Sequence, residues 1–421
     1  MGPGVLSAPF PRRDGRIHCG DVPAADLADR YGTPLYVYDM RSIRERIERF
    51  RSAFGPDALL AYSVKANGNL ELLRRLRAAG CGADITSLGE LFRARKAGIP
   101  PESIVFAGVG KTEGEITAAL QERIYGFNVE SEGELERIAR VAAGMGVRAP
   151  FAVRVNPDVV ADTPHEYTAT GHAATKFGVP LDRTRALYRW AVEQPSLLPR
   201  GVDVHIGSQI VEVRPYLEAL DRVLALVEDL RGEGIPLEYL DMGGGFGIRY
   251  DQEPGLDIDA LAAEVVPRVK ASGLRLVLEP GRAVVGEAGL LLTRVQYVKR
   301  TAAKTFVIVD GGMSELIRPS HYGGYHKVEP VDAMEGRTPE TVDVVGPVCE
   351  TGDFLARNRD IDMPEPGELL AVHTAGAYGF VMASNYNGRL RPAEILVDGA
   401  DVRLVRRRET LDDLIRAEEE L

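Results

Sequence analysis

Over about the first 275 residues, short apolar runs alternate with longer amphipathic segments. The runs are rich in β-branched residues and are bounded by turn residues, which is typical of buried strands. The segments between them are rich in Ala, Leu and Arg, and several end in glycine, as helices commonly do. The pattern predicts helices such as 70–80, 87–98 and 216–234. It predicts eight strands, at 58–67, 82–87, 103–108, 124–130, 150–157, 201–209, 238–245 and 274–282.

This alternation of strands and helices predicts an α/β fold. A doubly wound open sheet can be built from the same alternation. Eight strand–helix units over about 225 residues are, however, typical of a (β/α)8 TIM-like barrel. We therefore predict a barrel over residues 36–283.

The pattern changes at about residue 284, where strands follow one another with few helices and dense turn signals. Such a pattern favours an antiparallel β domain. The first 35 residues are Pro-rich and contain no long helical pattern, and we assign them to the same domain. The predicted β-rich domain therefore consists of residues 1–35 and 284–421. A charged helix is predicted at 411–421.

The composition narrows the possible partners. The chain of 421 residues carries 62 acidic and 51 basic side chains, a net charge of −11. It has no basic stripe interleaved with aromatics, so we expect no nucleic-acid partner. No apolar run approaches the roughly 18 residues of a membrane span, and the first residues lack a signal-peptide core, so we expect no membrane partner. Cys19, Cys81 and Cys349 are odd in number and far apart, which argues against a disulfide framework and a Cys-type zinc site and predicts a cytoplasmic location.

Four polar or glycine-rich features follow separate predicted strands. In barrels, catalytic groups lie at the carboxyl ends of the strands, while the outer helices pack. We therefore expect these four features to converge on one mouth of the barrel. They are Lys65, His205, the triple glycine 243–245 and the segment 279–282.

Each feature also has a plainer interpretation. A lysine at a strand end often extends along the surface, and a triple glycine often makes only a tight turn. At a barrel mouth, a partly desolvated lysine such as Lys65 can instead form a Schiff base. Gly244 lies where a barrel backbone often approaches a phosphate, although the segment fails the G-x-G-x-x-G pattern at Ile248.

Glu279 and Arg282 flank Pro280 and Gly281, a turn that can aim both side chains into the mouth. They can form an ion pair, or the carboxylate can keep a ring nitrogen protonated and leave the arginine for an anion. His205 can be a core histidine or can stack on a flat cofactor. A Schiff-base lysine, a phosphate cradle, an acid for a pyridinium and a stacking imidazole together predict pyridoxal 5'-phosphate.

Seven motifs occur in order between about residues 30 and 400. They are YSVKAN, HIGSQI, GGGFG, EPGR, LIRPSHYGGYH, GPVCETGD and GAYGFVMASNYNGRLRPAE. With these motifs the chain resembles the group IV, fold-type III pyridoxal-phosphate decarboxylases. The resemblance implies the alanine racemase-like fold, a PLP-dependent amino-acid decarboxylase and a homodimer with shared active sites.

The resemblance also implies a role for each site residue. Lys65 would carry the cofactor, His205 would stack on its ring, and Glu279 would face the pyridine nitrogen. Cys349 would return a proton after CO2 leaves, and Cys349 and Glu350 would come from the second subunit. The implied catalytic residues are Lys65, His205 and Cys349. The implied cofactor-binding residues are Lys65, His205, Gly244, Glu279, Pro280, Gly281, Arg282 and Tyr378. The implied substrate-binding residues are Arg282, Arg318, Tyr322, Glu350 and Tyr378.

Arg318 and Glu350 supply the two charges that a zwitterionic far end of a substrate needs. The resemblance therefore implies decarboxylation of meso-2,6-diaminopimelate to L-lysine and CO2, the last step of lysine biosynthesis. A diamine-forming relative would have no use for that arginine. The chain departs from the usual pattern RPALYGAYH by reading RPSHYGGYH, which puts His321 beside Tyr322, and the segment 164–178 has a variable middle.

Three alternatives stay open. A related decarboxylase of a secondary-metabolite pathway could act on another amino acid or on a carrier-protein-bound glutamyl group. A racemase of the same fold is disfavoured, because those enzymes face the pyridine nitrogen with an arginine rather than an acid such as Glu279. A cofactor-free regulatory homologue would be expected to lose Lys65 or Cys349, and the chain has both.

Overall fold

The structure is a computed structural model and describes residues 8–159, 176–333 and 336–419. The chain divides into two compact units. The barrel unit consists of Ile47–Ile248 and Pro254–Gly281. The β unit consists of Met1–Arg46, Arg249–Glu253 and Arg282–Leu421. Residues 164–175 of the loop with a variable middle lie outside the described residues.

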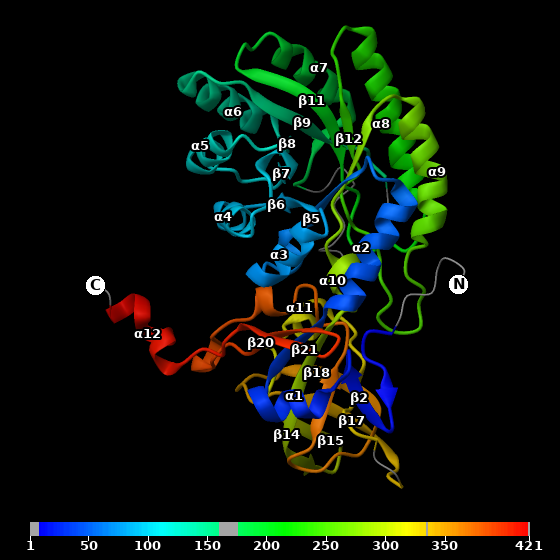
Figure 1. Cartoon of the computed structure of the whole chain (residues 1–421), viewed down its shortest axis with the longest axis vertical. Coiled ribbons are helices and arrows are strands. Elements are labelled where there is room, and N and C mark those ends of the chain that lie inside the picture. Colours follow the sequence, from blue (N-terminus) through cyan, green and yellow to red (C-terminus); the bar gives the residue numbers. More distant parts are fainter. Residues whose placement is uncertain (1–7, 160–175, 334–335, 420–421) are drawn as a thin grey trace. The chain divides into compact units, whose positions relative to one another are not determined.

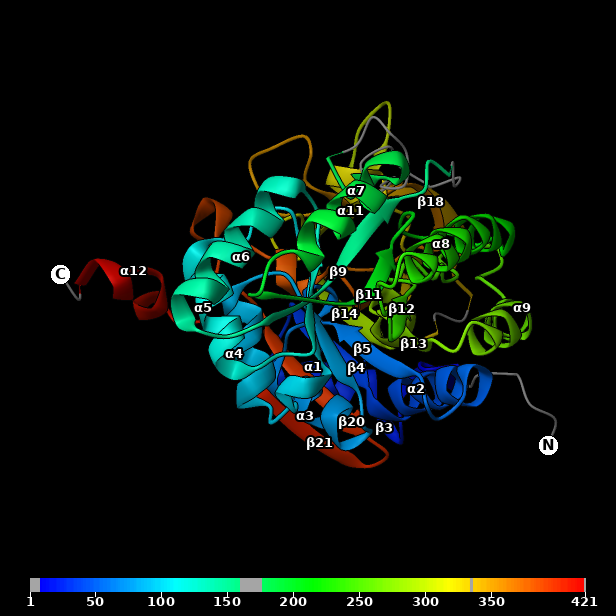
Figure 2. The same cartoon turned by 90° about the horizontal axis from the view of Figure 1, so that it is seen from above.

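The barrel unit contains the eight predicted strands. Each pairs in parallel with the next along the chain, and the last pairs with the first. The predicted barrel is therefore confirmed, and the open-sheet alternative is wrong (Figure 2). The strands are β5 (Leu59–Ser63), β6 (Gly82–Ile85), β7 (Ile104–Phe106), β8 (Gly126–Val129), β9 (Ala149–Asn156), β11 (Leu197–Val204), β12 (Tyr239–Asp241) and β13 (Arg275–Leu278). A short strand, β10 (Val179–Pro180), also pairs with β9.

Helices follow the strands and form a ring around them (Figure 2). Local sequence explains where they begin: the Asn69 side chain caps the first backbone N–H groups of α3, and Thr112 and Glu115 form a capping box at α5. The helices are α3 (Leu70–Ala78), α4 (Leu88–Lys96), α5 (Glu113–Glu122), α6 (Glu132–Met145), α7 (Leu181–Val192), α8 (Arg214–Gly232) and α9 (Ile258–Ala271). The buried residues of α8 recur every three or four positions, so one face of the helix packs inward.

The interior of the barrel is filled by side chains. Tyr239 lies in a buried cluster with Tyr125 and small or branched residues of neighbouring strands. A Cβ atom at Gly201 would lie 2.5 Å from the Tyr239 ring, so glycine at this position makes room for the aromatic ring. Polar residues appear at the last or next-to-last positions of several strands, among them Asp84 and Asp241, and this is the end that carries the predicted chemistry.

The β unit is built on one large sheet, and most of its strands are labelled in Figure 1. The strand order is β18-β17-β15-β14-β4-β20-β21. Most neighbours are antiparallel, as predicted, and two pairs, β15–β17 and β4–β20, are parallel. β19 (Leu369–Val372) pairs with β14 and with β16 (Val328–Pro330). The strands of the main sheet are β4 (Leu35–Asp39), β14 (Gly289–Arg300), β15 (Thr305–Val309), β17 (Pro339–Val345), β18 (Phe354–Asp362), β20 (Ala393–Asp398) and β21 (Asp401–Arg406).

The N-terminal residues pack in the β unit. A small sheet of β1 (Arg12–Arg13), β2 (Arg16–Cys19) and β3 (Val22–Pro23), with α1 (Ala24–Tyr31), contributes to a core shared with β14, β19 and β20. The two units divide at Arg46 and Arg282 rather than at residues 36 and 284, because β4 pairs with β14 and β20. The helix α2 (Met40–Phe54) runs across the first of these boundaries.

Three further helices belong to the β unit: α10 (Arg282–Val285), α11 (Arg318–Tyr322) and α12 (Leu411–Glu419). The last confirms the charged helix predicted near residue 411. Among the described residues, no helix is long and apolar enough to cross a membrane, and no group of three metal-binding side chains was found.

Candidate active site

Lys65 lies just beyond the end of a barrel strand. Strand β5 ends at Ser63, and Val64–Ala66 form a turn of 3-10 helix, so the predicted strand 58–67 is too long at this end. The Lys65 Nζ atom donates a hydrogen bond to Asp84 Oδ2 at 2.9 Å. Asp84 is fully buried, whereas the Lys65 side chain is 38% exposed. The amine is therefore bound to an interior carboxylate and does not simply extend along the surface.

Asp84 belongs to the end of β6 and is a residue that sequence reasoning missed. The Ser63 hydroxyl lies 2.9 Å from Asp84 Oδ2 and 2.9 Å from the Glu279 carbonyl oxygen. The second carboxylate oxygen, Oδ1, is buried and has no hydrogen-bond partner in the described part of the chain. An acceptor left in this state costs about 1–3 kcal/mol, which marks a position kept for something other than stability.

The triple glycine after β12 brings the backbone of two strand ends together. Gly243 and Gly245 have positive φ angles of +64° and +85°, which few other residues adopt. A Cβ atom at Gly244 would lie 2.3 Å from the Glu279 carbonyl oxygen. The Gly244 N–H donates to His205 Nδ1 at 3.1 Å. The glycines are therefore required for close backbone approach, as a phosphate cradle also requires.

His205 directly follows β11 and is a neutral imidazole. Because Gly244 donates to Nδ1, the ring proton is assigned to Nε2. Burial and the nearby cations Arg154 and Lys65 lower the pKa of His205 well below its ordinary value. A neutral flat ring next to Gly244 suits stacking on an aromatic cofactor.

Glu279 is buried among other acids. Its Oε1 atom accepts from Asn128 Nδ2 at 3.1 Å, and the same amide lies 3.1 Å from Asp241 Oδ2. Burial, together with Asp241, Asp84 and Asp203, raises the pKa of Glu279 well above its ordinary value, and Lys65 offsets part of this. A carboxyl group in these surroundings binds its proton more tightly than an exposed one, which suits a hydrogen bond with a ring nitrogen.

Asp203 and Asp241 complete this group of acids at the ends of β11 and β12. Burial raises the pKa of Asp241 to about 6, although the Gly243 N–H donates to its Oδ1 atom at 2.9 Å. Burial and Asp241 raise the pKa of Asp203 well above its ordinary value. The sequence signal for these residues was an acid at the last or next-to-last position of an otherwise apolar strand.

A second cluster, in the β unit, contains two arginines around a tyrosine. Arg282 Nη1 donates to Tyr250 Oη at 2.6 Å, and the Arg318 guanidinium lies 4.6 Å from the centre of the Tyr250 ring. Arg282 also lies 4.8 Å from the ring centre of Tyr378, which adopts a positive φ of +55°. Sequence reasoning missed Tyr250, which has no charge and lies in an irregular loop.

Arg318 is 8% exposed and begins α11, the helix that ends at Tyr322. Burial and the repulsion of Arg282 lower the pKa of Arg318 from its ordinary value. No carboxylate of the described residues lies within ion-pair distance of Arg318. A buried guanidinium without an acid suits an anionic ligand.

Cys349 and Glu350 lie on an exposed turn of the β unit. Asp353 fixes this turn by accepting from the backbone N–H groups of Met313 and Val348, each at 2.6 Å. The Cys349 N–H donates to Asn387 Oδ1 at 3.3 Å. Sequence reasoning found the cysteine and the glutamate, and the structure adds the buried aspartate that holds them.

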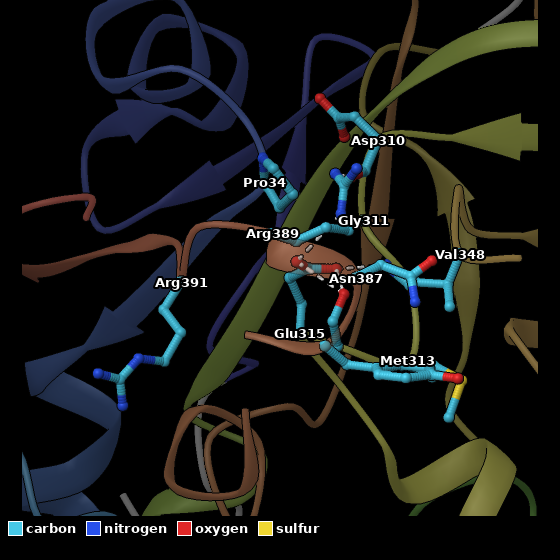
Figure 3. A network of polar contacts seen from close by, with 12 residues as sticks. Pro34, Asp310, Gly311, Met313, Glu315, Val348, Asn387, Arg389 and Arg391 are labelled. Atoms are coloured by element: carbon cyan, nitrogen blue, oxygen red, sulfur yellow. Dashed lines mark hydrogen bonds and ion pairs between the residues drawn. The ribbon is translucent and has the colours of Figure 1, made fainter. Parts of the chain in front are cut away.

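The same part of the β unit is reinforced by a polar network. Figure 3 shows Arg389 between Asp310 and Glu315, with its Nη2 atom 2.6 Å from the Asp310 carbonyl oxygen. Glu315 accepts from the Gly312 N–H at 2.6 Å. The segment that carries Asn387 is thereby tied to the sheet.

The predicted residues thus fall into three groups within the two units. Lys65, His205, Gly244 and Glu279 come together at the strand ends of the barrel unit. Arg282, Arg318 and Tyr378 gather around Tyr250 in the β unit. Cys349 and Glu350 share the exposed turn.

Comparisons with known proteins agree with this geometry. Residues 40–286 match the family model of the pyridoxal-dependent decarboxylase, pyridoxal binding domain. Fold and site therefore define a pyridoxal-dependent amino-acid decarboxylase, and the predicted cofactor is confirmed.

The full-length relatives narrow the class further. The chain is 49% identical to a diaminopimelate decarboxylase of Aquifex aeolicus, over 96% of each protein, and 48% identical to one of Pseudomonas aeruginosa, over 97% of this chain and 98% of that one. It also resembles the crystal structure of diaminopimelate decarboxylase from Helicobacter pylori complexed with L-lysine, with a TM-score of 0.90, 39% identity and coverage of 94% of this chain and 99% of that one. The chain belongs to the diaminopimelate decarboxylase family.

The residues of the barrel fit the cofactor on structural grounds. Buried oxygen atoms of Asp84, Asn128 and Asp203 have no hydrogen-bond partner among the described residues, so the strand ends hold more acceptors than the protein itself satisfies. The buried carboxyl group of Glu279 suits a pyridine nitrogen, and the glycine backbone suits a phosphate.

Proposed function

We propose that the protein decarboxylates meso-2,6-diaminopimelate to L-lysine and CO2 with pyridoxal 5'-phosphate as cofactor. The observation that carries the choice of substrate is the pair of arginines around Tyr250, of which Arg318 is buried and Arg282 is half-buried. A substrate that keeps a carboxylate at its far end uses such a pair, whereas a diamine-forming reaction leaves it without a ligand. The names of the full-length relatives support the same reaction.

The barrel residues hold the cofactor and its charge. Lys65 would hold the cofactor aldehyde through its amine, His205 would stack on the ring, and the backbone at Gly244 would bind the phosphate together with the turn Pro280–Gly281. When bound, the cofactor would supply an electron sink for the electron pair of the Cα–carboxylate bond. Glu279 keeps the ring nitrogen protonated, which that electron flow requires.

The β-unit residues bind the substrate. Arg282 and Arg318 attract the far carboxylate, and the hydroxyls of Tyr322 and Tyr378 add neutral hydrogen-bond donors. Glu350 binds the far ammonium group. Both charges of the far end are then matched, which a ligand that lacks either group at that end cannot achieve.

Cys349 donates the proton that replaces the lost carboxylate. Its thiol is free and exposed, and Asp353 holds its turn. We propose a homodimer in which each barrel receives Cys349 of the partner subunit and Glu350 of the partner subunit. A free thiol with this task also favours the cytoplasm, where thiols stay reduced.

The test is an assay of purified protein with pyridoxal 5'-phosphate and meso-diaminopimelate. We expect CO2 and L-lysine in equal amounts, and neither product from the Lys65→Ala variant. If the protein binds the cofactor, as seen by its absorbance, and forms neither product, the substrate assignment is wrong. If it binds no cofactor at all, the regulatory alternative gains support.

A second candidate substrate rests on His321. Its ring lies 4.5 Å from the Tyr322 ring in an edge-on arrangement, at the position where the sequence departs from the usual pattern. A decarboxylase of a secondary-metabolite pathway, acting on another amino acid or on a carrier-bound glutamyl group, could use this difference. Faster turnover of such a substrate than of meso-diaminopimelate would favour this candidate.

A further inference from the structure

Arg318 is held by a histidine rather than by an acid. Its Nη1 atom lies 2.9 Å from Nε2 of His326, a residue that is 0% exposed and lies between α11 and β16. The rings of His326 and Tyr250 meet edge to face, with ring centres 5.6 Å apart and planes at 82°. Tyr250 therefore packs against both members of the Arg318–His326 pair.

The partners of His326 determine its tautomer. Its Nδ1 atom lies 2.8 Å from the His373 carbonyl oxygen, which can only accept, so Nδ1 carries the proton. Nε2 is then the acceptor for Arg318, whose guanidinium can only donate. Burial lowers the pKa of His326 to about 3, with Arg318, Arg282 and Arg359 adding to the effect. The ring is therefore neutral at any ordinary pH.

A neutral acceptor orients a guanidinium without cancelling its charge, whereas an acid in the same place would cancel it. It fixes the direction of the Arg318 guanidinium but leaves its positive charge uncompensated. A carboxylate would fix the same group and cancel its charge, so that an incoming carboxylate would gain little. A buried histidine that only fills the core has no need for an arginine as its hydrogen-bond donor.

We propose that His326 is a positioning residue that sets the preference for ligands with a carboxylate at the far end, by orienting Arg318 without neutralising it. The proposal rests on the proposed function, because it takes Arg318 to bind that carboxylate. It adds a residue that does not itself contact the substrate.

The test compares two ligands of the holoenzyme that differ in one group. L-lysine keeps the far carboxylate, and cadaverine is the same molecule without it. Calorimetric titration gives a dissociation constant for each. In the His326→Leu variant we expect the constant for L-lysine to rise about tenfold or more, because a hydrogen bond to a charged group is lost. The constant for cadaverine should change less than twofold.

Two variants of equal size separate orientation from charge. In His326→Gln an amide oxygen can still accept from Arg318, so L-lysine binding should recover to within about threefold of the wild type. In His326→Glu the acceptor is stronger but carries a negative charge, so L-lysine binding should weaken more than in His326→Gln. If His326 only filled the core, the two variants would not differ in this order.

The matched control is His18→Leu. His18 is also a histidine of the β unit whose Nδ1 atom contacts a backbone carbonyl, that of Arg16 at 3.0 Å, and it lies in β2. This variant should bind both ligands as the wild type does.

Two results would overturn the inference. One is an equal loss of L-lysine and cadaverine binding in every His326 variant, which would indicate a purely structural role. The other is unchanged L-lysine binding in His326→Leu. Failure of the proposed function has a different signature, because the wild type itself would then release no CO2 from meso-diaminopimelate. If His326→Leu does not fold, the comparison of His326→Gln with His326→Glu decides.

Discussion

The barrel unit gathers acidic side chains at one place, whereas the β unit gathers two arginines. In the barrel unit Asp84, Asp241 and Glu279 crowd together, so that burial raises the pKa of Asp241 and of Glu279. In the β unit Arg282 and Arg318 stay close together around Tyr250, at a cost in desolvation and repulsion. The first arrangement favours a protonated ring, and the second favours a carboxylate. A ligand of matching charge would stabilise either cluster.

Replacing Glu279 by Gln tests the role of the shared proton. Glu279→Gln keeps the size of the side chain, but an amide cannot share an acidic proton with the ring nitrogen. We expect turnover to fall by about 100-fold or more while cofactor binding is kept. Rates of CO2 release, normalised to bound cofactor measured by absorbance, check this. The exposed Glu238, which pairs with Arg200, gives the control Glu238→Gln, expected to retain wild-type turnover.

The raised pKa of Asp241 predicts a pH-dependent stability of the protein without its cofactor. Asp241 binds a proton more tightly in the folded state, with a pKa of about 6, than in the unfolded state, with an ordinary value of 3.8. Its contribution is fully present below pH 4 and is lost as the pH rises through about 6, so the free energy of unfolding should fall across this window. Denaturant titrations from pH 4 to 7 measure the slope. Asp241→Asn should reduce that slope, and an unchanged slope would show that another group is responsible.

Among the elements, the barrel strands were predictable because each is buried on both faces and reads as a continuous apolar run. The partner of a strand was less predictable. Leu35–Asp39 reads like a barrel strand but pairs with Gly289–Arg300, some 250 residues away, and local periodicity carries no information on such pairing. The site residues differed in the same way in how well the sequence predicted them. Lys65 and the glycines follow strands, so they were predicted. His326 was not, because its role depends on a contact with Arg318 that exists only in the folded chain.

The glycine loop after β12 is expected to affect the affinity for the cofactor. Gly244→Ala places a methyl group 2.3 Å from the Glu279 carbonyl oxygen, so the backbone of one of the two strand ends must move. We expect the dissociation constant for pyridoxal 5'-phosphate to rise about tenfold or more. The control is Gly232→Ala at the end of α8, where an added Cβ meets nothing within 4 Å. Titration of cofactor absorbance gives both values, and equal affinities would exclude a cradle at Gly244.

At the scale of the whole molecule, the proposed homodimer explains why Cys349 lies far along the chain from the barrel residues with which it would act. Cys349 is exposed, and its turn is held by Asp353 and Asn387 of the same β unit. A group held this firmly at the surface is suited to act on a neighbouring copy of the chain. The cofactor-binding lysine and the proton donor would then be contributed by different subunits, which separately inactivated variants can reveal.

Mixing Lys65→Ala with Cys349→Ala tests this arrangement. Each variant alone should fold and should lack turnover, because every one of its sites misses either Lys65 or Cys349. After subunit exchange half of the dimers are hybrids, and each hybrid has one complete site of two, so about a quarter of wild-type activity should return. The control mixes Lys65→Ala with Glu279→Gln, two changes in the barrel, and should restore nothing because every site keeps one defect. Hybrids that form, as shown by mass-tagged subunits, but stay inactive in the first mixture would show that Cys349 serves its own chain or none.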